Sequence, residues 1–207
     1  MIPRYQKILF IVLLIASLAM GVVLWQLRQR AHRRLVAGQA SAPTQAPEVA
    51  PAEQATLVAA NDADNSLVPQ VHSLPLPVDP GARARAVLGR LLDLYAAPDA
   101  VHPVPGGAAS VAQVFLLPAT GEKESQNPGA QLAVVNLTGS FAASHPSGLE
   151  TETLTVLSIC GTLRANLPHV TQVRFLVDGQ QRPTLAGHAD LTRTYLAAEA
   201  APTEGAH

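Results

Sequence analysis

Few residues in this chain combine a reactive type with a spacing that suits chemistry, and several of them fall within residues 148–179. Glu150 and Glu152 could form an acid–base pair. Two positions apart on a helix, however, they diverge by about 200°. Cys160 could be a nucleophile, but it lies on an apolar helical face, where a thiol is unreactive. Asp178 precedes a glycine, and turn formation explains that pair. The stretch therefore predicts packed structure and not an active site.

The histidines do not form a zinc-type pair at i and i+4 of any predicted helix. His145, His169 and His188 could share a metal, yet their places in loops and at strand starts favour exposed surface positions. The sequence holds no G-x-S-x-G, H-E-x-x-H or phosphate-binding motif. The sequon at Asn136 lies inside a predicted strand, so we discount glycosylation there. We predict no catalytic residue, no cofactor, no metal and no enzymatic activity.

The first predicted helix is indicated by one apolar face. Asp79 and Pro80 suit its N-cap and first position, and Pro98 ends it. Arg90 and Asp93 lie away from the apolar face. That face is formed by Ala84, Val87, Leu88, Leu91 and Tyr95.

A second helix is predicted after Ser147. Ser147 and Glu150 match the S-x-x-E capping box, so we expect Glu150 to accept from the Ser147 amide. Leu154 and Ile159 lie off the apolar face, which predicts that they are exposed and could mark a partner surface. The apolar face itself consists of Leu149, Thr153, Val156, Leu157, Cys160, Leu163 and Leu167.

Strands are predicted at residues 71–78, 111–118, 131–138 and 170–177. The short loop between the second and third of these favours an antiparallel pair. We therefore expect an α+β fold, in which a small mixed or antiparallel sheet carries two amphipathic helices on one face. A turn at Asp178-Gly179 follows the last strand.

The N-terminal part of the chain predicts membrane attachment. After a flank at residues 1–7, residues 8–27 form an apolar run long enough to cross the roughly 30 Å hydrocarbon core as a helix. A cleaved secretory signal is the alternative. Four arginines follow the run, and the positive-inside rule counted on them favours a cytoplasmic C-terminus. The envelope character of the rest of the chain leads us to expect an extracytoplasmic C-terminal domain instead.

The remaining boundaries follow from composition. Residues 28–69 are predicted to be a basic flank and a disordered Ala/Pro-rich linker, with a short helix near residues 53–60 as the alternative. Residues 70–196 form the predicted folded domain, and residues 197–207 a disordered tail. The formal net charge of −1 excludes a strongly basic nucleic-acid-binding surface, and a single cysteine excludes an internal disulfide.

The folded part resembles the GerMN domain, named from a spore germination protein. The resemblance covers about residues 70–195 and rests on the order and spacing of four stretches. Asn136 stands where the family usually has Asp, Gly161 where Asn is common, and Ala108 where Thr is usual, which puts any partner contact at these positions in doubt. The four stretches are VPGGAASVAQVFL (104–116), LAVVNLTGSF (132–141), SGLETETLTVLSICGTL (147–163) and LPHVTQVRFLVDG (167–179).

The resemblance implies a non-catalytic module of the cell envelope, linked to sporulation, germination or cell-wall processes. We expect a single-pass protein of the cytoplasmic (inner) membrane that binds envelope proteins, with homo-oligomers as one form of that contact. Two alternatives stay open: a peptidoglycan or wall-glycan binding module, and a regulator of a wall hydrolase. Exposed aromatic side chains gathered in a groove would favour glycan binding. Nucleic acid is not an expected partner.

Overall fold

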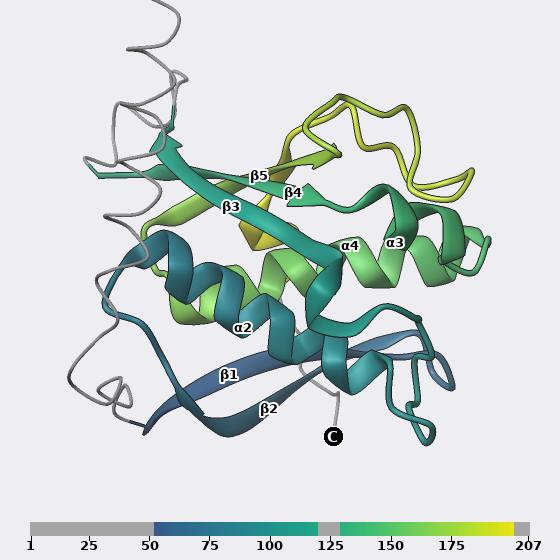
Figure 1. The fold of residues 1–207 in the computed structure, drawn as a ribbon, viewed down its shortest axis with the longest axis horizontal. Coiled ribbons are helices and arrows are strands. Elements are labelled where there is room, and N and C mark those ends of the chain that lie inside the picture. The colour runs from purple at the N-terminus through teal and green to yellow at the C-terminus, as the bar shows by residue number, and fades with distance from the viewer. Residues whose placement is uncertain (1–51, 120–128, 201–207) are drawn as a thin grey trace, which may run out of the picture. The chain divides into compact units, whose positions relative to one another are not determined.

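The computed structural model describes residues 52–119 and 129–200, all within the unit Val49–His207. The predicted segments 1–7 and 8–27 lie outside these residues, as do most of the linker and residues 201–207 of the tail. Among the described residues, no helix has the length and apolarity needed to cross a membrane. The described chain has a mixed α+β fold with two separate sheets (Figure 1).

The larger sheet has four strands in the order β3-β4-β5-β6. The strands are β3 (Val111–Pro118), β4 (Gln131–Leu137), β5 (Val170–Val177) and β6 (Tyr195–Leu196). The pairing of β3 with β4 is antiparallel, as predicted. The pairing of β4 with β5 is parallel, because the chain crosses over through a helix between them. The sheet is therefore mixed.

The first predicted helix is confirmed as α2 (Pro80–Tyr95). The Asp79 side chain caps it by accepting from the Ala82 amide at 2.7 Å. Every residue of the predicted apolar face is buried. A short helix that was not predicted, α3 (Gly139–Ser144), begins after Thr138, whose hydroxyl accepts from the Phe141 amide.

The second predicted helix is α4 (Leu149–Asn166), but its predicted capping box is wrong. The N-cap residue is Gly148, which has no side chain to cap the helix, and Ser147 precedes it. The S-x-x-E pattern is therefore offset by one residue, and Glu150 is exposed. Leu149, assigned to the buried face, is also exposed.

A β-hairpin corrects the C-terminal part of the predicted linker. Residues 52–69 are ordered in β1 (Ala52–Asn61) and β2 (Ser66–Pro75), and the alternative of a helix at 53–60 is also wrong. The predicted strand at 71–78 overlaps only the end of β2. The sequence of β1 is rich in alanine, which has low strand propensity. Long-range contacts, described below, hold this strand in place.

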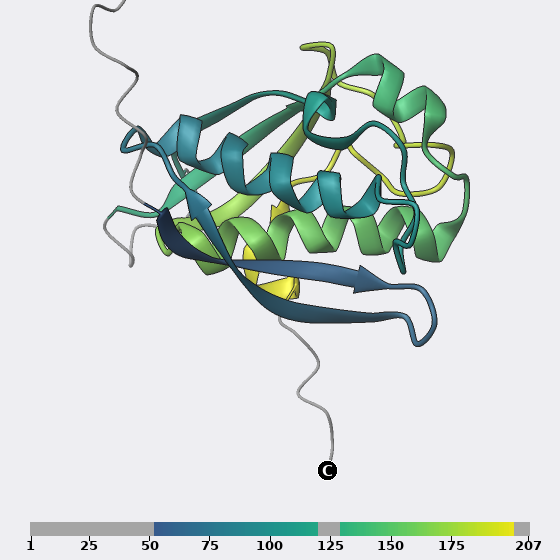
Figure 2. The ribbon, with the colours of Figure 1, turned by 60° about the horizontal axis from the view of Figure 1, so that its bottom comes forward.

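The helices α2 and α4 lie between the four-stranded sheet and the hairpin (Figures 1 and 2). The prediction that both helices cover one face of a sheet is confirmed, but a third layer, the hairpin, covers their other side. Leu154 and Ile159 are consequently buried, at 7% and 1% exposure, and the prediction that they are exposed is wrong. The predicted disordered tail also needs correction, because Ala197–Ala200 form a 3-10 helix with Ala197 and Ala200 buried.

Candidate functional site

A line of polar side chains runs along the buried helix α4. Its spacing of three or four residues places all members on one side of the helix. Four of the five are fully buried, which is unusual for such residue types. We call this set the polar stripe: Glu152, Thr155, Ser158, Thr162 and Asn166.

The C-terminal half of the polar stripe binds the edge of β1. The Thr162 hydroxyl accepts from the Val58 amide at 2.9 Å. Asn166 accepts from the Thr56 amide at 3.1 Å and donates to the Thr56 carbonyl at 2.7 Å. Residues four apart on α4 thus match backbone groups two apart on β1. The side chains of a helix supply the hydrogen bonds that a further strand would otherwise make.

Tyr95, at the end of α2, continues this pattern along β1. Its hydroxyl accepts from the Ala60 amide at 2.8 Å. Burial raises the pKa of Tyr95 to about 12, so the phenol stays protonated at neutral pH. Its role is therefore to hold the strand edge.

The middle of the polar stripe joins a chain of four side chains. Asp62, in the hairpin turn, lies 2.5 Å from Nδ1 of His102, and Nε2 of His102 lies 2.7 Å from the Thr155 hydroxyl. His145 Nε2 approaches the same hydroxyl at 2.9 Å. Carboxylate, imidazole and hydroxyl follow one another in the order of a catalytic triad.

The surroundings of these four hydrogen-bonded side chains do not suit catalysis. The Thr155 hydroxyl is buried at 0% exposure and also donates to the Thr151 carbonyl at 3.0 Å. The His102 ring is equally enclosed. Burial lowers the pKa of His145 below its ordinary value, which favours its neutral form. A nucleophile must reach a substrate, so we interpret Thr155 as a structural junction between α4 and two loops.

The N-terminal end of the polar stripe holds a buried carboxylate, Glu152. Its Oε2 accepts from the amides of Ala186, His188 and Ala189, each at 2.9 Å. Its Oε1 accepts from the His188 ring at 2.9 Å and from the Gly148 amide at 3.3 Å. Burial by itself raises the pKa of Glu152, but these donors outweigh it and hold the pKa at about 2. The ionised carboxylate fastens the loop between β5 and β6 to α4.

The other predicted site residues also have structural positions. Cys160 is completely buried, and burial raises the pKa of its thiol far above the ordinary value, in agreement with a core role. Asp178 lies in the predicted turn with φ of 49°, and its carboxylate accepts from the Gly139 amide at 2.8 Å. Asn136 lies in β4, and its side chain accepts from the Gly179 amide.

Among the described residues, the three histidines considered as metal ligands do not form a cluster that could hold a metal ion. His169 is exposed, as predicted. The prediction is wrong for His145, which is 5% exposed and bound to Thr155. His188 is exposed, as predicted, and its ring pairs with Glu152. Sequence reasoning missed His102 and Thr155. The polar stripe on α4 was a signal for Thr155, but no local pattern indicated His102.

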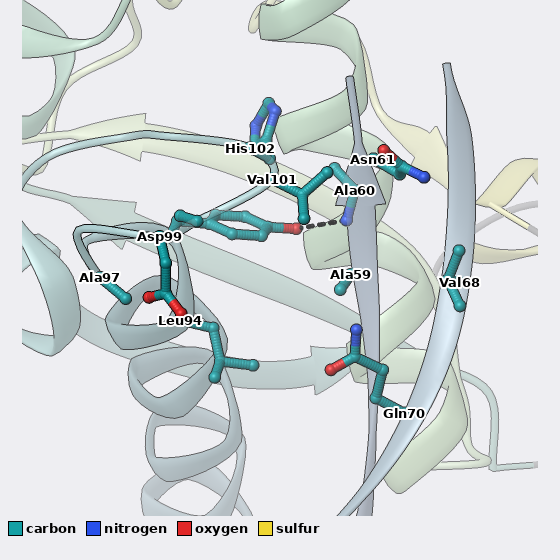
Figure 3. A pocket seen from close by; sticks show the side chains of 12 residues that line it. Ala59, Ala60, Asn61, Val68, Gln70, Leu94, Ala97, Asp99, Val101 and His102 are labelled. Atoms are coloured by element: carbon teal, nitrogen blue, oxygen red, sulfur yellow. Dashed lines mark hydrogen bonds between the residues drawn. The ribbon is translucent and has the colours of Figure 1, made fainter. Parts of the chain in front are cut away.

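A hollow of about 360 Å³ lies between the hairpin and the end of α2 (Figure 3). Gln70 from β2 and Leu94 from α2 face this space, and Asp99 borders it from the following loop. The Tyr95 hydroxyl at its wall is already bound to Ala60. The lining contains neither Lys nor Arg, and its histidine, His102, is bound to Asp62 and Thr155.

The side of the four-stranded sheet that faces away from the helices carries an exposed apolar surface. Along β4 and β5, residues such as Val135 and Phe175 point inward and are buried, and their neighbours are partly exposed. Cross-strand pairing places the outward residues in continuous rows. We call this surface the outer face, and its apolar members are Phe115, Leu117, Leu132, Val134, Leu176 and Leu196.

Phe115 is the one exposed aromatic residue among those that the structure describes. Tyr95, Phe141, Phe175 and Tyr195 are all buried. A stacking platform for a glycan normally presents several aromatic rings, so the described residues do not favour glycan binding.

The polar stripe thus binds backbone and side-chain groups of the same domain. Residues 53–183, more than half of the chain, match the Germane family, described as sporulation and spore germination. The chain belongs to this family. The matched region includes the β-hairpin, which agrees with its place in the fold. No curated protein matches the chain.

Solved structures with similarity to this chain include GerMN domains. The tandem GerMN domains of the sporulation protein GerM from Bacillus subtilis share 15% identity, with a TM-score of 0.43 over 75% of this chain and 51% of that one. The first GerMN domain of the same protein shares 14% identity, with a TM-score of 0.38 over 71% and 98%. A candidate lipoprotein from Clostridium perfringens shares 18% identity, with a TM-score of 0.38 over 75% and 95%. The family assignment rests on the sequence match alone.

Proposed function

We propose that this protein is a non-catalytic interaction module of the cell envelope. In this proposal, residues 8–27 anchor it in the cytoplasmic membrane, and the domain binds other envelope proteins outside the cytoplasm. The description of the Germane family as sporulation and spore germination supports an envelope setting.

One observation carries the proposal: the groups capable of chemistry are enclosed, whereas an apolar sheet face is exposed. Thr155, Cys160 and Glu152 are each at 0% exposure. Phe115 and Leu117, in contrast, are 47% and 49% exposed on the outer face. Exposed apolar patches of this kind typically mark contacts with partners.

Membrane topology is the first test of the proposal. Alkaline phosphatase fused after Thr203 should be active in cells, because the enzyme folds only outside the cytoplasm, and a cytoplasmic reporter at the same position should be inactive. The reverse pattern would place the domain in the cytoplasm and contradict the envelope proposal. Deletion of residues 8–27 is the control, and it should abolish phosphatase activity.

A further inference from the structure

On the outer face, Arg174 lies among apolar side chains and the polar side chain of Gln172. Cross-strand pairing aligns Phe115, Val134 and Arg174 in one row across β3, β4 and β5. The neighbouring row contains Leu117, Leu132, Gln172 and Leu196. Arg174 therefore lies near the middle of the outer face.

Among the residues that the structure describes, none forms an ion pair with Arg174. Its Nε is shielded from solvent and has no hydrogen-bond acceptor. The ion pairs of the described residues involve other arginines, such as Arg83 with Glu53 and Arg193 with Glu199. A shielded donor without an acceptor is costly, and a carboxylate supplied from outside would remove that cost.

We propose that the outer face binds an amphipathic helix of a partner protein, which carries one Asp or Glu within its apolar stripe and sets that carboxylate against Arg174. This inference rests on the proposed interaction function and names its surface and the chemistry of its partner. At the row of Arg174 the three strands β3 to β5, spaced by about 4.8 Å, span roughly 10 Å, and β6 widens the sheet to roughly 14 Å at the row of Gln172 and Leu196. This width suits a helix of about 10–12 Å diameter. The inner face of the same sheet is already covered by helices in this manner.

A second copy of this chain is a poorer occupant of the outer face. A two-fold interface brings the same surface of both copies together. Two Arg174 side chains near the centre would then approach each other without a carboxylate between them. Repulsion between like charges in an apolar contact disfavours that arrangement.

Site-specific photo-crosslinking of the full chain in its native cells tests this inference. A photo-reactive residue replaces Leu117 on the outer face or, in a control, the exposed Val71 on the hairpin. Adducts from position 117 should map to a partner segment with apolar residues at i, i+3, i+4 and i+7 and an acidic residue among them. Arg174→Glu should reduce the adduct yield by roughly tenfold, and Arg174→Lys, which keeps the charge, by less than about twofold.

A charge reversal completes the test. Changing the mapped acidic residue of the partner to Lys should restore the adduct in the Arg174→Glu chain. Equal urea unfolding midpoints for Arg174→Glu and Arg174→Lys would exclude a folding defect as the cause.

Four outcomes would overturn the inference. Adducts that map to a second copy or to this chain itself would replace the proposed occupant. An adduct yield that Arg174→Glu does not change would show that no carboxylate of the partner binds Arg174. Adducts from position 71 alone would agree with an interaction module but would assign its binding surface to the hairpin. The absence of adducts from both positions would contradict the proposed function as well.

Discussion

At the scale of single residues, Glu152 shows how hydrogen-bond donors of the same domain can surround a buried carboxylate. Five donors, one from the N-cap residue Gly148 and four from the loop between β5 and β6, surround its two oxygens. A buried carboxylate with this many donors stays ionised and stabilises the loop that supplies them. At Gly161, α4 packs tightly against its neighbours, because a Cβ there would lie 3.0 Å from Val58 and 3.1 Å from the Ala200 carbonyl.

Glu152→Gln should lower the free energy of unfolding at pH 7 by about 3 kcal/mol, since the pKa lies at about 2 instead of the ordinary 4.5. A lowered pKa contributes stability that is fully present above pH 4.5 and is lost as the pH falls toward 2. The difference between the two proteins should therefore shrink between pH 4.5 and pH 2. Urea denaturation of residues 49–207 across this range measures it.

Glu150→Gln is the matched control, because Glu150 is exposed and lies on the same turn of α4. Its effect at pH 7 should stay within about 0.5 kcal/mol. A Glu152→Gln penalty that does not depend on pH would contradict the structural role of the ionised form.

At the scale of elements, α4 protects the edge of β1 with side chains. The amides of Thr56, Val58 and Ala60 point away from β2 and find acceptors on the helices. The residues of β2 that pair with these three therefore direct their own backbone groups toward the outer edge of β2. Pro69, which pairs with Val58, is one of them. Proline is tolerated at such a position because it has no amide to leave unpaired. One edge of the hairpin is covered by α4, and proline blunts the other.

Thr162→Val tests this edge protection with nearly unchanged volume. The substitution leaves the buried Val58 amide without an acceptor and should cost about 1–3 kcal/mol of unfolding free energy. The hydrogen-exchange rate of the Val58 amide, measured by NMR, should rise as the free energy of unfolding falls. Thr153→Val on the partly exposed side of α4 is the control, and equal effects of both variants would count against the interpretation.

At the scale of the whole molecule, the hairpin is a structural layer of the domain. Ala55, Leu57, Val58, Ala59 and Ala60 belong to the same buried cluster as Phe175 of the four-stranded sheet. Without the hairpin, one side of α4 would expose both apolar residues and the polar groups that now bind β1.

A fragment of residues 49–207 should therefore unfold cooperatively, whereas a fragment of residues 70–207 should not. The shorter chain lacks β1 and the first part of β2 and would leave α4 half covered. Thermal unfolding followed by near-UV circular dichroism and binding of a hydrophobic dye distinguishes the two. Cooperative melting of the shorter fragment at the same midpoint would show that the hairpin is dispensable.

Local patterns in the sequence determined α2, β3, β4, α4, β5 and the turn at Asp178-Gly179. Each depends on a period, a cap or a turn residue within one short stretch, such as Asp79 and Pro80 at the start of α2. The burial of Cys160 followed from the same patterns. The hairpin turn at residues 61–66 also carried a local signal, because Asn61 and Asp64 accept from amides two residues ahead.

Only the tertiary structure decided the hairpin, the third layer and the environment of the polar residues. The bonds from β1 to α4 join residues 104 and 110 positions apart, so no window of sequence contains both partners. For the same reason, the proximity of His102 and His145 at Thr155 could not be predicted. The period of α4 indicated one buried side, but whether its second side faces water or protein depends on a strand that lies far away in the chain.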